Sequence, residues 1–287
     1  MLHHHKRVAP VRKAAVAGTW YPGTRQALEA AIDDHLAAAL DGPPDLARLV
    51  ALIAPHAGLT YSGGVAAYAY RQLRHRDVDL VVLAGPSHFV GFDGVAVYRR
   101  GGFDSPLGIA EIDEESATAM MRASATIREH DAAHAREHSL EMQLPFVRRL
   151  LPRARILPLV MGWQTAATAT ALADALAVVL RDKRAVIVAS TDLSHYQDAN
   201  RAAALDAVVI DHVRQFNPEG LQRALAACPE HACGGGPAVA VMCAARALGA
   251  RDAVVLKYGD SGDVSGDKSA VVGYLAAAFG IRDAADD

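Results

Sequence analysis

The chain of 287 residues lacks several features that would place it in a class of protein at once. It has only three cysteines, Cys228, Cys233 and Cys243, and this odd number suits a reducing cytoplasm better than a disulfide framework. No apolar run approaches the roughly 18 residues of a membrane-spanning helix, and the broken apolar stretch near the N-terminus is too short for a secretory signal. We therefore expect a cytoplasmic protein without a membrane partner.

An excess of charge of one sign is missing as well. Lys and Arg number 29 and Asp and Glu 32, so the net charge of −3 argues against nucleic-acid binding driven by charge. Neither G-x-G-x-x-G nor G-x-x-x-x-G-K-[ST] occurs, so no nucleotide cofactor is indicated. Hydrophobic residues make up 52% of the chain, enough for a sizeable core. His3, His4 and His5 resemble a tag fragment, and we expect residues 1–7 to be disordered.

Apolar, β-branched runs alternate with Ala-rich amphipathic segments along the whole chain. In the segment 24–41, for example, Leu28, Ile32 and Leu36 recur every four residues, as on one face of a helix. The alternation predicts an α/β sheet with helices on both faces, and no linker composition divides it into two domains. The predicted helices are 24–41, 64–75, 113–122, 139–151, 165–181, 199–214, 219–227 and 236–248, and the predicted strands are 49–54, 80–84, 155–160, 185–190, 253–258 and 270–278.

Two histidines stand directly after predicted strands. His56 follows the apolar run 49–53 and His88 follows the run 80–83, each in a turn that contains Pro and Gly. Either histidine alone is compatible with a purely structural loop role. Their separation of 32 residues is about one β-α-β unit, which predicts neighbouring strands and two imidazoles within reach of each other. Since α/β sheets bind ligands at the carboxyl ends of their strands, the pair favours a shared metal or substrate site.

Further polar residues follow the same pattern. Asp192 and His195 come just after the predicted strand 185–190, where Asp192 could orient the imidazole of His195 or accept hydrogen bonds from loop amides. Cys233 precedes a predicted helix, whose N-terminal dipole could favour a thiolate. Cys243 lies among apolar residues and is expected to be an inert thiol.

The segment EHSLEMQLPF, 137–146, is unusually rich in groups that could serve a site. It contains Glu137, His138 and Glu141, with Ser139 as a candidate N-cap of the predicted helix. The order of residues is not H-E-x-x-H, so a zincin-type site is not supported. Glu141 is compatible with a buried cap or ion pair, and we take His138 as a catalytic candidate.

Eight segments in one order resemble a known family: AGTWYPG (17–23), APHAGLTYSGG (54–64), GPSHFVGFDG (85–94), SPLG (105–108), EHSLEMQLPF (137–146), STDLSHY (190–196), ACGGGP (232–237) and GDVSGDKSAVVGY (262–274). They look like the Memo family, whose bacterial members are called AmmeMemoRadiSam system protein B. The resemblance covers nearly the whole chain. It implies a single Memo-like domain over 1–287 with a three-layer α/β fold, a central mixed sheet and helices on both faces. This fold is similar to that of the class III extradiol ring-cleaving dioxygenases, which use non-haem Fe(II).

The same resemblance implies a set of site residues. His56, His88 and Cys233 fall on the family's metal-ligand positions, and Asp192 and His195 on its remaining pocket positions, with His195 as the acid/base histidine. A cysteine in place of the carboxylate of a facial triad makes the site softer and oxidisable. We therefore expect one divalent or transition metal ion, Fe(II) first, with Cu or Zn as alternatives.

Three functions compete on these residues. The first is a metal-dependent, dioxygenase-like oxidoreductase that acts on a small substrate, with His195 moving a proton. The second is a metal or redox accessory protein without turnover, which would bind a peptide or act with radical SAM and AMMECR1-like partner proteins, as the bacterial family name suggests. The third is a zinc-type metallohydrolase in which His195 activates metal-bound water.

Overall fold

The computed structural model describes residues 10–39 and 46–282. The expected disorder of residues 1–7, and with it His3, His4 and His5, lies outside these residues. Every helix and strand expected from the sequence is present in the structure, and its observed ends differ from the expected ones by five residues at most. None of the helices in the described ranges is long and apolar enough to cross a membrane.

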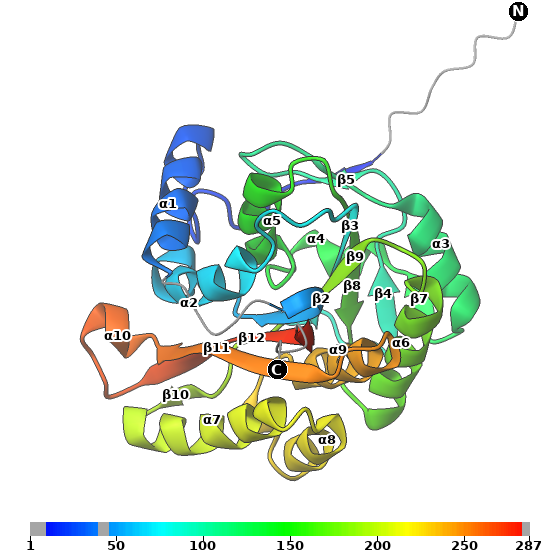
Figure 1. Cartoon of the computed structure of the whole chain (residues 1–287). Helices are drawn as coiled ribbons and strands as arrows, with labels where there is room; N and C mark the ends of the chain where they lie inside the picture. The colour runs from blue at the N-terminus through cyan, green and yellow to red at the C-terminus, as the bar shows by residue number, and fades with distance from the viewer. Residues whose placement is uncertain (1–9, 40–45, 283–287) are drawn as a thin grey trace, which may run out of the picture.

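The helices and strands alternate along the described chain (Figure 1). The helices are α1 Arg25–Ala38, α2 Leu59–Arg71, α3 Glu114–Ala123, α4 Asp131–Ala135, α5 Leu144–Leu150, α6 Ala166–Val179, α7 Ala199–Arg214, α8 Pro218–Ala227, α9 Gly235–Ala247 and α10 Gly262–Ser265, with 3₁₀ turns η1 Glu141–Gln143 and η2 Pro229–His231. The strands are β1 Val11–Arg12, β2 Leu46–Ala54, β3 Leu80–Pro86, β4 Val95–Val97, β5 Gly102–Phe103, β6 Ala110–Glu111, β7 Ile127–Glu129, β8 Arg155–Met161, β9 Ala185–Ser190, β10 His195–Gln197, β11 Asp252–Asp260 and β12 Val271–Arg282.

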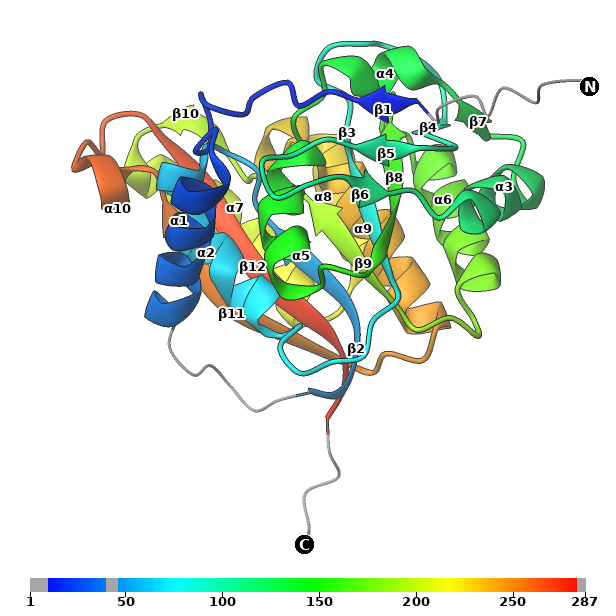
Figure 2. The same ribbon diagram turned by 90° about the horizontal axis from the view of Figure 1, so that it is seen from above.

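A mixed sheet forms the middle layer. Its strand order is β10-β12-β2-β9-β3-β8-β4-β7, with β11 paired to β12. The four central strands β2, β9, β3 and β8 are parallel, whereas β12 and β4 run antiparallel to their neighbours β2 and β8. Helices α1, α2 and α5 lie on one face of the sheet, and α3, α6, α7 and α9 lie on the other, where α8 packs against α7 and α9 (Figure 2). The predicted three-layer α/β fold is confirmed.

One topological prediction is wrong. The strands before His56 and His88 are β2 and β3, and they are not neighbours because β9 pairs with both of them. A parallel strand can be inserted at any position of a sheet once its helical connection is long enough, so spacing in sequence does not fix adjacency. The insertion has a consequence for the site, since it places Asp192, which follows β9, between the two histidines.

Local chemistry explains where most helices begin. The side chains of Thr24, Asp113, Thr165 and Asp198 accept hydrogen bonds from amides of the first helical turn. The expected single helix over 139–151 is instead a 3₁₀ turn followed by α5, which has Pro145 near its start. Ser139 is not its N-cap, because its hydroxyl donates to the carbonyl of Pro86 at the end of β3.

The N-terminal segment is anchored by one buried carboxylate, Glu141. Its side chain is fully buried and forms an ion pair with Arg12. It also accepts hydrogen bonds from the amides of Ala15 and Val16 and from the hydroxyl of Tyr21. Glu141 is therefore the buried ion-pair partner that the sequence allowed, and it fixes residues 12–21 against the segment that carries His138.

Replacing Glu141 with Gln is expected to destabilise the protein by about 3–5 kcal/mol, because the buried guanidinium of Arg12 would lose its only carboxylate partner among the described residues. Chemical denaturation measures the change. Glu29→Gln is the matched control, since its pair with Arg25 is largely exposed and is worth about 0–1 kcal/mol. Equal effects of the two substitutions would contradict the anchoring role of Glu141.

Candidate metal centre

The candidate site lies at the carboxyl ends of three parallel strands. His56, His88 and Asp192 each stand two residues beyond the last residue of β2, β3 and β9, which are Ala54, Pro86 and Ser190. The loop between α4 and η1 adds His138, and the turn before α9 adds Cys233. Five of the predicted site residues therefore lie at one edge of the sheet, as expected for an α/β fold.

Three imidazoles make up the centre of the site. The metal-ligating atoms of His56, His88 and His138 all lie within 4.8 Å of one another. The ring centroids of His56 and His88 are 5.2 Å apart, and those of His88 and His138 are 4.4 Å apart. His56 and His138 are buried, whereas His88 is exposed at the mouth of the site. This cluster can hold a metal ion.

A chain of hydrogen bonds fixes the tautomer of His56. The single hydroxyl proton of Ser190 goes to the carbonyl of Ser139 at 2.7 Å, so the hydroxyl oxygen must accept from its other two neighbours. Those neighbours are the side-chain amide of Gln143 at 2.8 Å and Nδ1 of His56 at 2.9 Å. Nδ1 of His56 therefore carries a proton and Nε2 presents a lone pair. Burial above all lowers the pKa of His56 to about 3, which keeps the ring neutral.

Glu137 fixes His88 in the same manner. One carboxylate oxygen lies 2.8 Å from Nδ1 of His88 and the other accepts the His88 amide at 2.6 Å. Burial raises the pKa of Glu137, but the hydrogen bonds from His88 and Ser139 outweigh it and lower the pKa to about 2. An ionised carboxylate on Nδ1 leaves Nε2 of His88 free for a metal, the arrangement usual behind metal-bound histidines.

His138 differs from the other two histidines in what holds it. Its Nδ1 lies 3.7 Å from Glu137, too far for a hydrogen bond, and its ring packs against Trp20 at 4.4 Å and Phe89 at 5.8 Å between centroids. Burial, with the charges of His56 and His88, lowers the pKa of His138 to about 4. The ring is therefore neutral at pH 7 and positioned by packing alone.

Cys233 contacts the histidine cluster at His56. Its Sγ lies 3.3 Å from Nε2 of His56 and accepts the amide of Asp192, also at 3.3 Å. Burial and the charge of Asp192 raise the pKa of Cys233 above its usual range, so the dipole of α9 does not by itself produce a thiolate. A metal ion bound to Sγ would lower the pKa of Cys233, because metal coordination deprotonates a thiol.

Asp192 and His195 have separate surroundings. The Asp192 carboxylate accepts the amide of His56 at 2.7 Å and that of Ala57, so it braces the loop after β2. The sequence allowed Asp192 either to orient His195 or to accept hydrogen bonds from loop amides, and the structure shows the second role. Within the described residues no hydrogen bond joins Asp192 to His195, whose ring is half-buried beside Tyr196. The charge of His195 contributes to the lowered pKa of His56, so the two rings are near enough to interact electrostatically.

Sequence reasoning did not single out Ser190 or the Glu137–His88 contact. Ser190 is a polar residue at the end of an otherwise apolar strand, and this signal could have identified it. Nothing in the sequence indicated that Glu137, 49 residues away, would reach His88.

The family of the chain follows from comparison with known proteins. The family model described as Memo-like protein matches residues 12–278. The chain belongs to the Memo family. A MEMO1 family protein of Methanothermobacter thermautotrophicus is 36% identical over 272 residues, covering 92% of this chain and 98% of the relative. One from Methanosarcina mazei is 38% identical over 270 residues, covering 93% and 98%.

A solved structure shares the fold of this Memo family member. It is the crystal structure of an uncharacterized protein, JW3007, from Escherichia coli K12, with a TM-score of 0.53 and 16% sequence identity. The similarity covers 79% of this chain and 99% of the other. The predicted three-layer α/β architecture is thereby confirmed at the level of the fold.

Proposed function

We propose that this protein is a metal-dependent, dioxygenase-like oxidoreductase that binds one Fe(II) through His56, His88 and Cys233 and acts on a small molecule. The observation that carries the proposal is the pair of imidazoles whose Nδ1 atoms face Ser190 and Glu137. With Nδ1 occupied, Nε2 of each ring is left to bind a metal, and the ligating atoms of the histidine cluster lie within 4.8 Å of one another.

The three histidines differ in the hydrogen bonds that their Nδ1 atoms make. His56 and His88 have an oxygen partner on Nδ1 within 2.9 Å, whereas His138 has none within hydrogen-bond distance among the described residues. We therefore assign the first two as ligands. Cys233 is the third, because its Sγ lies 3.3 Å from Nε2 of His56, close to the spacing of two ligands on one ion with bonds of about 2.0–2.3 Å.

The donor set suits a transition metal. Two imidazole nitrogens and one thiolate favour Fe, Cu or Zn over Mg or Ca. When bound, a redox-active metal with an open position supplies the electron transfer that an oxidoreductase needs, which no side chain of the site provides.

The remaining side chains of the pocket would position and protonate the substrate. His138 is neutral and has no hydrogen bond fixing Nδ1, so it can accept a proton at a ring nitrogen. His195 is half-buried at the start of β10 and can exchange protons with solvent. Trp20 and Phe89 pack against the ring of His138 and hold its position.

Metal analysis of protein purified without oxygen tests the proposal. We expect about one Fe per chain, together with oxygen uptake that depends on an added small substrate. Stoichiometric Zn without oxygen uptake would overturn the proposal in favour of a hydrolase. Metal binding with no uptake for any substrate of a chemical library would favour the accessory function instead.

Glu137→Gln is expected to weaken metal binding by about 10–100-fold, because the amide no longer provides a charged acceptor for Nδ1 of His88. Competition with a chelator of known affinity measures the change. Glu129→Gln is the matched control, since its side chain pairs with Arg99 on the surface. An unchanged affinity in Glu137→Gln would show that His88 is not a ligand.

A further inference from the structure

We propose that a basic cleft at the amino ends of β2, β3 and β9 binds a small organic phosphate with an apolar body. This edge of the sheet is opposite the candidate metal centre, so the proposal does not depend on the function proposed above. The cleft has a volume of about 440 Å³, within the usual range for small-molecule sites.

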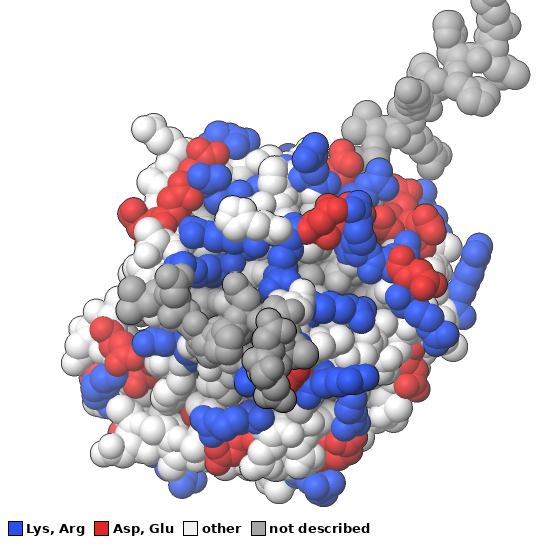
Figure 3. All heavy atoms as spheres, viewed as in Figure 1, with Lys and Arg blue, Asp and Glu red and all other residues white. Residues whose placement is uncertain are grey.

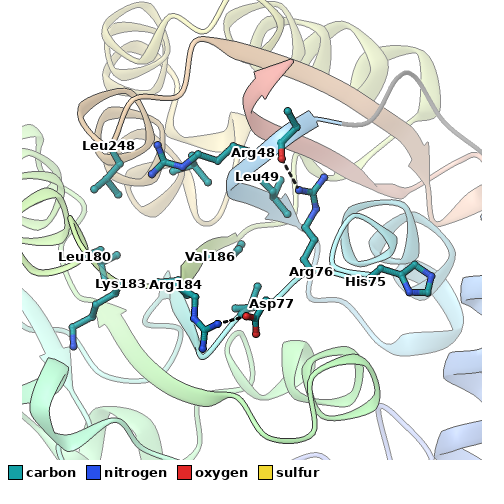
Figure 4. A pocket seen from close by; sticks show the side chains of 14 residues that line it. Arg48, Leu49, His75, Arg76, Asp77, Leu180, Lys183, Arg184, Val186 and Leu248 are labelled. Carbon is teal, nitrogen blue, oxygen red and sulfur yellow. Dashed lines mark hydrogen bonds and ion pairs between the residues drawn. The ribbon is translucent and has the colours of Figure 1, made fainter. Parts of the chain in front are cut away.

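Three chain segments form the cleft. They are the start of β2, the connection from α2 to β3, and the turn from α6 into β9, with Leu248 closing one end. Figure 4 shows the guanidinium group of Arg48 beside Leu248, that of Arg76 at the start of β2 and that of Arg184 on the other side of Val186, while His75 points away. Figure 2 places this edge near the end of β12, away from the loops that carry the histidines.

The charge of the lining is strongly one-sided. Arg48, Arg76, Lys183 and Arg184 line the cleft, against a single carboxylate, Asp77. Figure 3 views this face of the molecule and shows many lysine and arginine side chains around its centre, with aspartate and glutamate mostly toward its margins. The net charge of the whole chain is −3, so this concentration of cations is local.

The cations differ in how far they are neutralised. Arg184 pairs with Asp77 and Asp79, and Lys183 lies 3.7 Å from Glu115. Among the described residues no carboxylate pairs with Arg48 or Arg76. These two guanidinium groups therefore leave two positive charges for an anionic ligand.

Hydrogen bonds to backbone carbonyls hold the guanidinium group of Arg76 in one orientation. Its Nε donates to the carbonyl of Gln72 at 2.6 Å, and its two terminal nitrogens donate to the carbonyls of Ala47 and Leu46. A guanidinium has five N–H groups, so two remain free while the plane is fixed by backbone. A fixed guanidinium loses little entropy on binding and matches the oxygens of a phosphate.

The rest of the lining sets the class of ligand. Leu49, Val50, Val78, Leu180, Val186 and Leu248 contribute an apolar surface beside the cations. An inorganic anion would leave this surface uncovered, whereas an organic phosphate would contact it with its apolar body. Phosphate is preferred to carboxylate as the anionic group because it carries two charges and three oxygens, which match the N–H groups of a guanidinium.

Isothermal titration with naphthyl phosphate tests the proposal, with naphthol and inorganic phosphate as comparison probes. We expect naphthyl phosphate to bind at millimolar concentration or below and more tightly than either probe. Arg48→Gln should weaken it by about 10-fold or more, since a charge-assisted contact is lost. Arg76→Gln should act alike, but it also removes bonds to β2, so Arg48→Gln is the decisive variant.

Two matched variants keep the result specific. Arg201→Gln removes the same charge from an exposed residue of α7, which contributes nothing to the lining, and should leave the affinity unchanged. His88→Ala should also leave it unchanged, because the metal centre lies at the other edge. No binding at millimolar naphthyl phosphate, equal binding of naphthol, or equal losses in Arg48→Gln and Arg201→Gln would each overturn the proposal.

Discussion

Replacing His88 with Ala is expected to lower the affinity for the metal by about 100-fold or more, so that the purified variant contains almost none. The loss should exceed that of Glu137→Gln, because the substitution removes a ligand and not only its supporting hydrogen bond. Elemental analysis of the purified variant, followed by titration with Fe(II) under anaerobic conditions, measures the effect. The fold should persist, since His88 lies in the loop after β3 and its side chain, which is 27% exposed, is not part of the hydrophobic core.

The matched control for His88→Ala is His75→Asn. His75 is an exposed histidine at the opposite edge of the sheet, with φ of 61°, a left-handed conformation that Asn tolerates. We expect full metal content in this variant. Full metal content in His88→Ala would instead show that the third imidazole, His138, replaces His88 as a ligand.

Replacing His195 with Gln is expected to leave the metal content near that of the unmodified protein and to lower turnover by about 10²–10⁴-fold. The reason is that His56, His88 and Cys233 already supply three ligands, and a fourth protein ligand would close the position that a substrate needs. Oxygen uptake with an accepted substrate, together with elemental analysis, separates the two effects. Asp192→Asn is not a suitable second test of proton transfer, because the Asp192 carboxylate accepts hydrogen bonds from the backbone amides of His56 and Ala57 and its loss would disturb that loop.

Two outcomes would contradict the role of His195. Loss of metal in His195→Gln would show that it is a ligand. Unchanged turnover would assign proton transfer to His138, and His138→Gln would then be the variant that loses activity.

The layers of the fold could be predicted because the long elements carry strong periodic signals. The runs before His56, His88 and Asp192 are short, β-branched and closed by turn residues, and each is a buried strand in the structure. The short strands β1, β4, β5, β6, β7 and β10 were not predicted, because two or three residues are too few to show a period.

The composition of the site could be predicted only in part. Position after a strand identified His56, His88 and Asp192, because a strand delivers its next residues to one edge of the sheet whatever the strand order is. The order itself could not be predicted, and β9 separates the two strands that spacing had paired. The support from Ser190 and Glu137 depends on contacts between distant segments, which a single sequence does not show.

The central claim is that one metal ion is bound by two imidazoles and the thiolate of Cys233. X-ray absorption spectroscopy at the edge of the metal, on Fe(II)-loaded protein, tests it most directly. We expect a nitrogen or oxygen shell with imidazole scattering and one sulfur scatterer about 0.2–0.3 Å farther from the metal. The sulfur should disappear in Cys233→Ser. A first shell without sulfur in the loaded, unmodified protein would contradict Cys233 as a ligand and would favour a centre made of His56, His88 and His138.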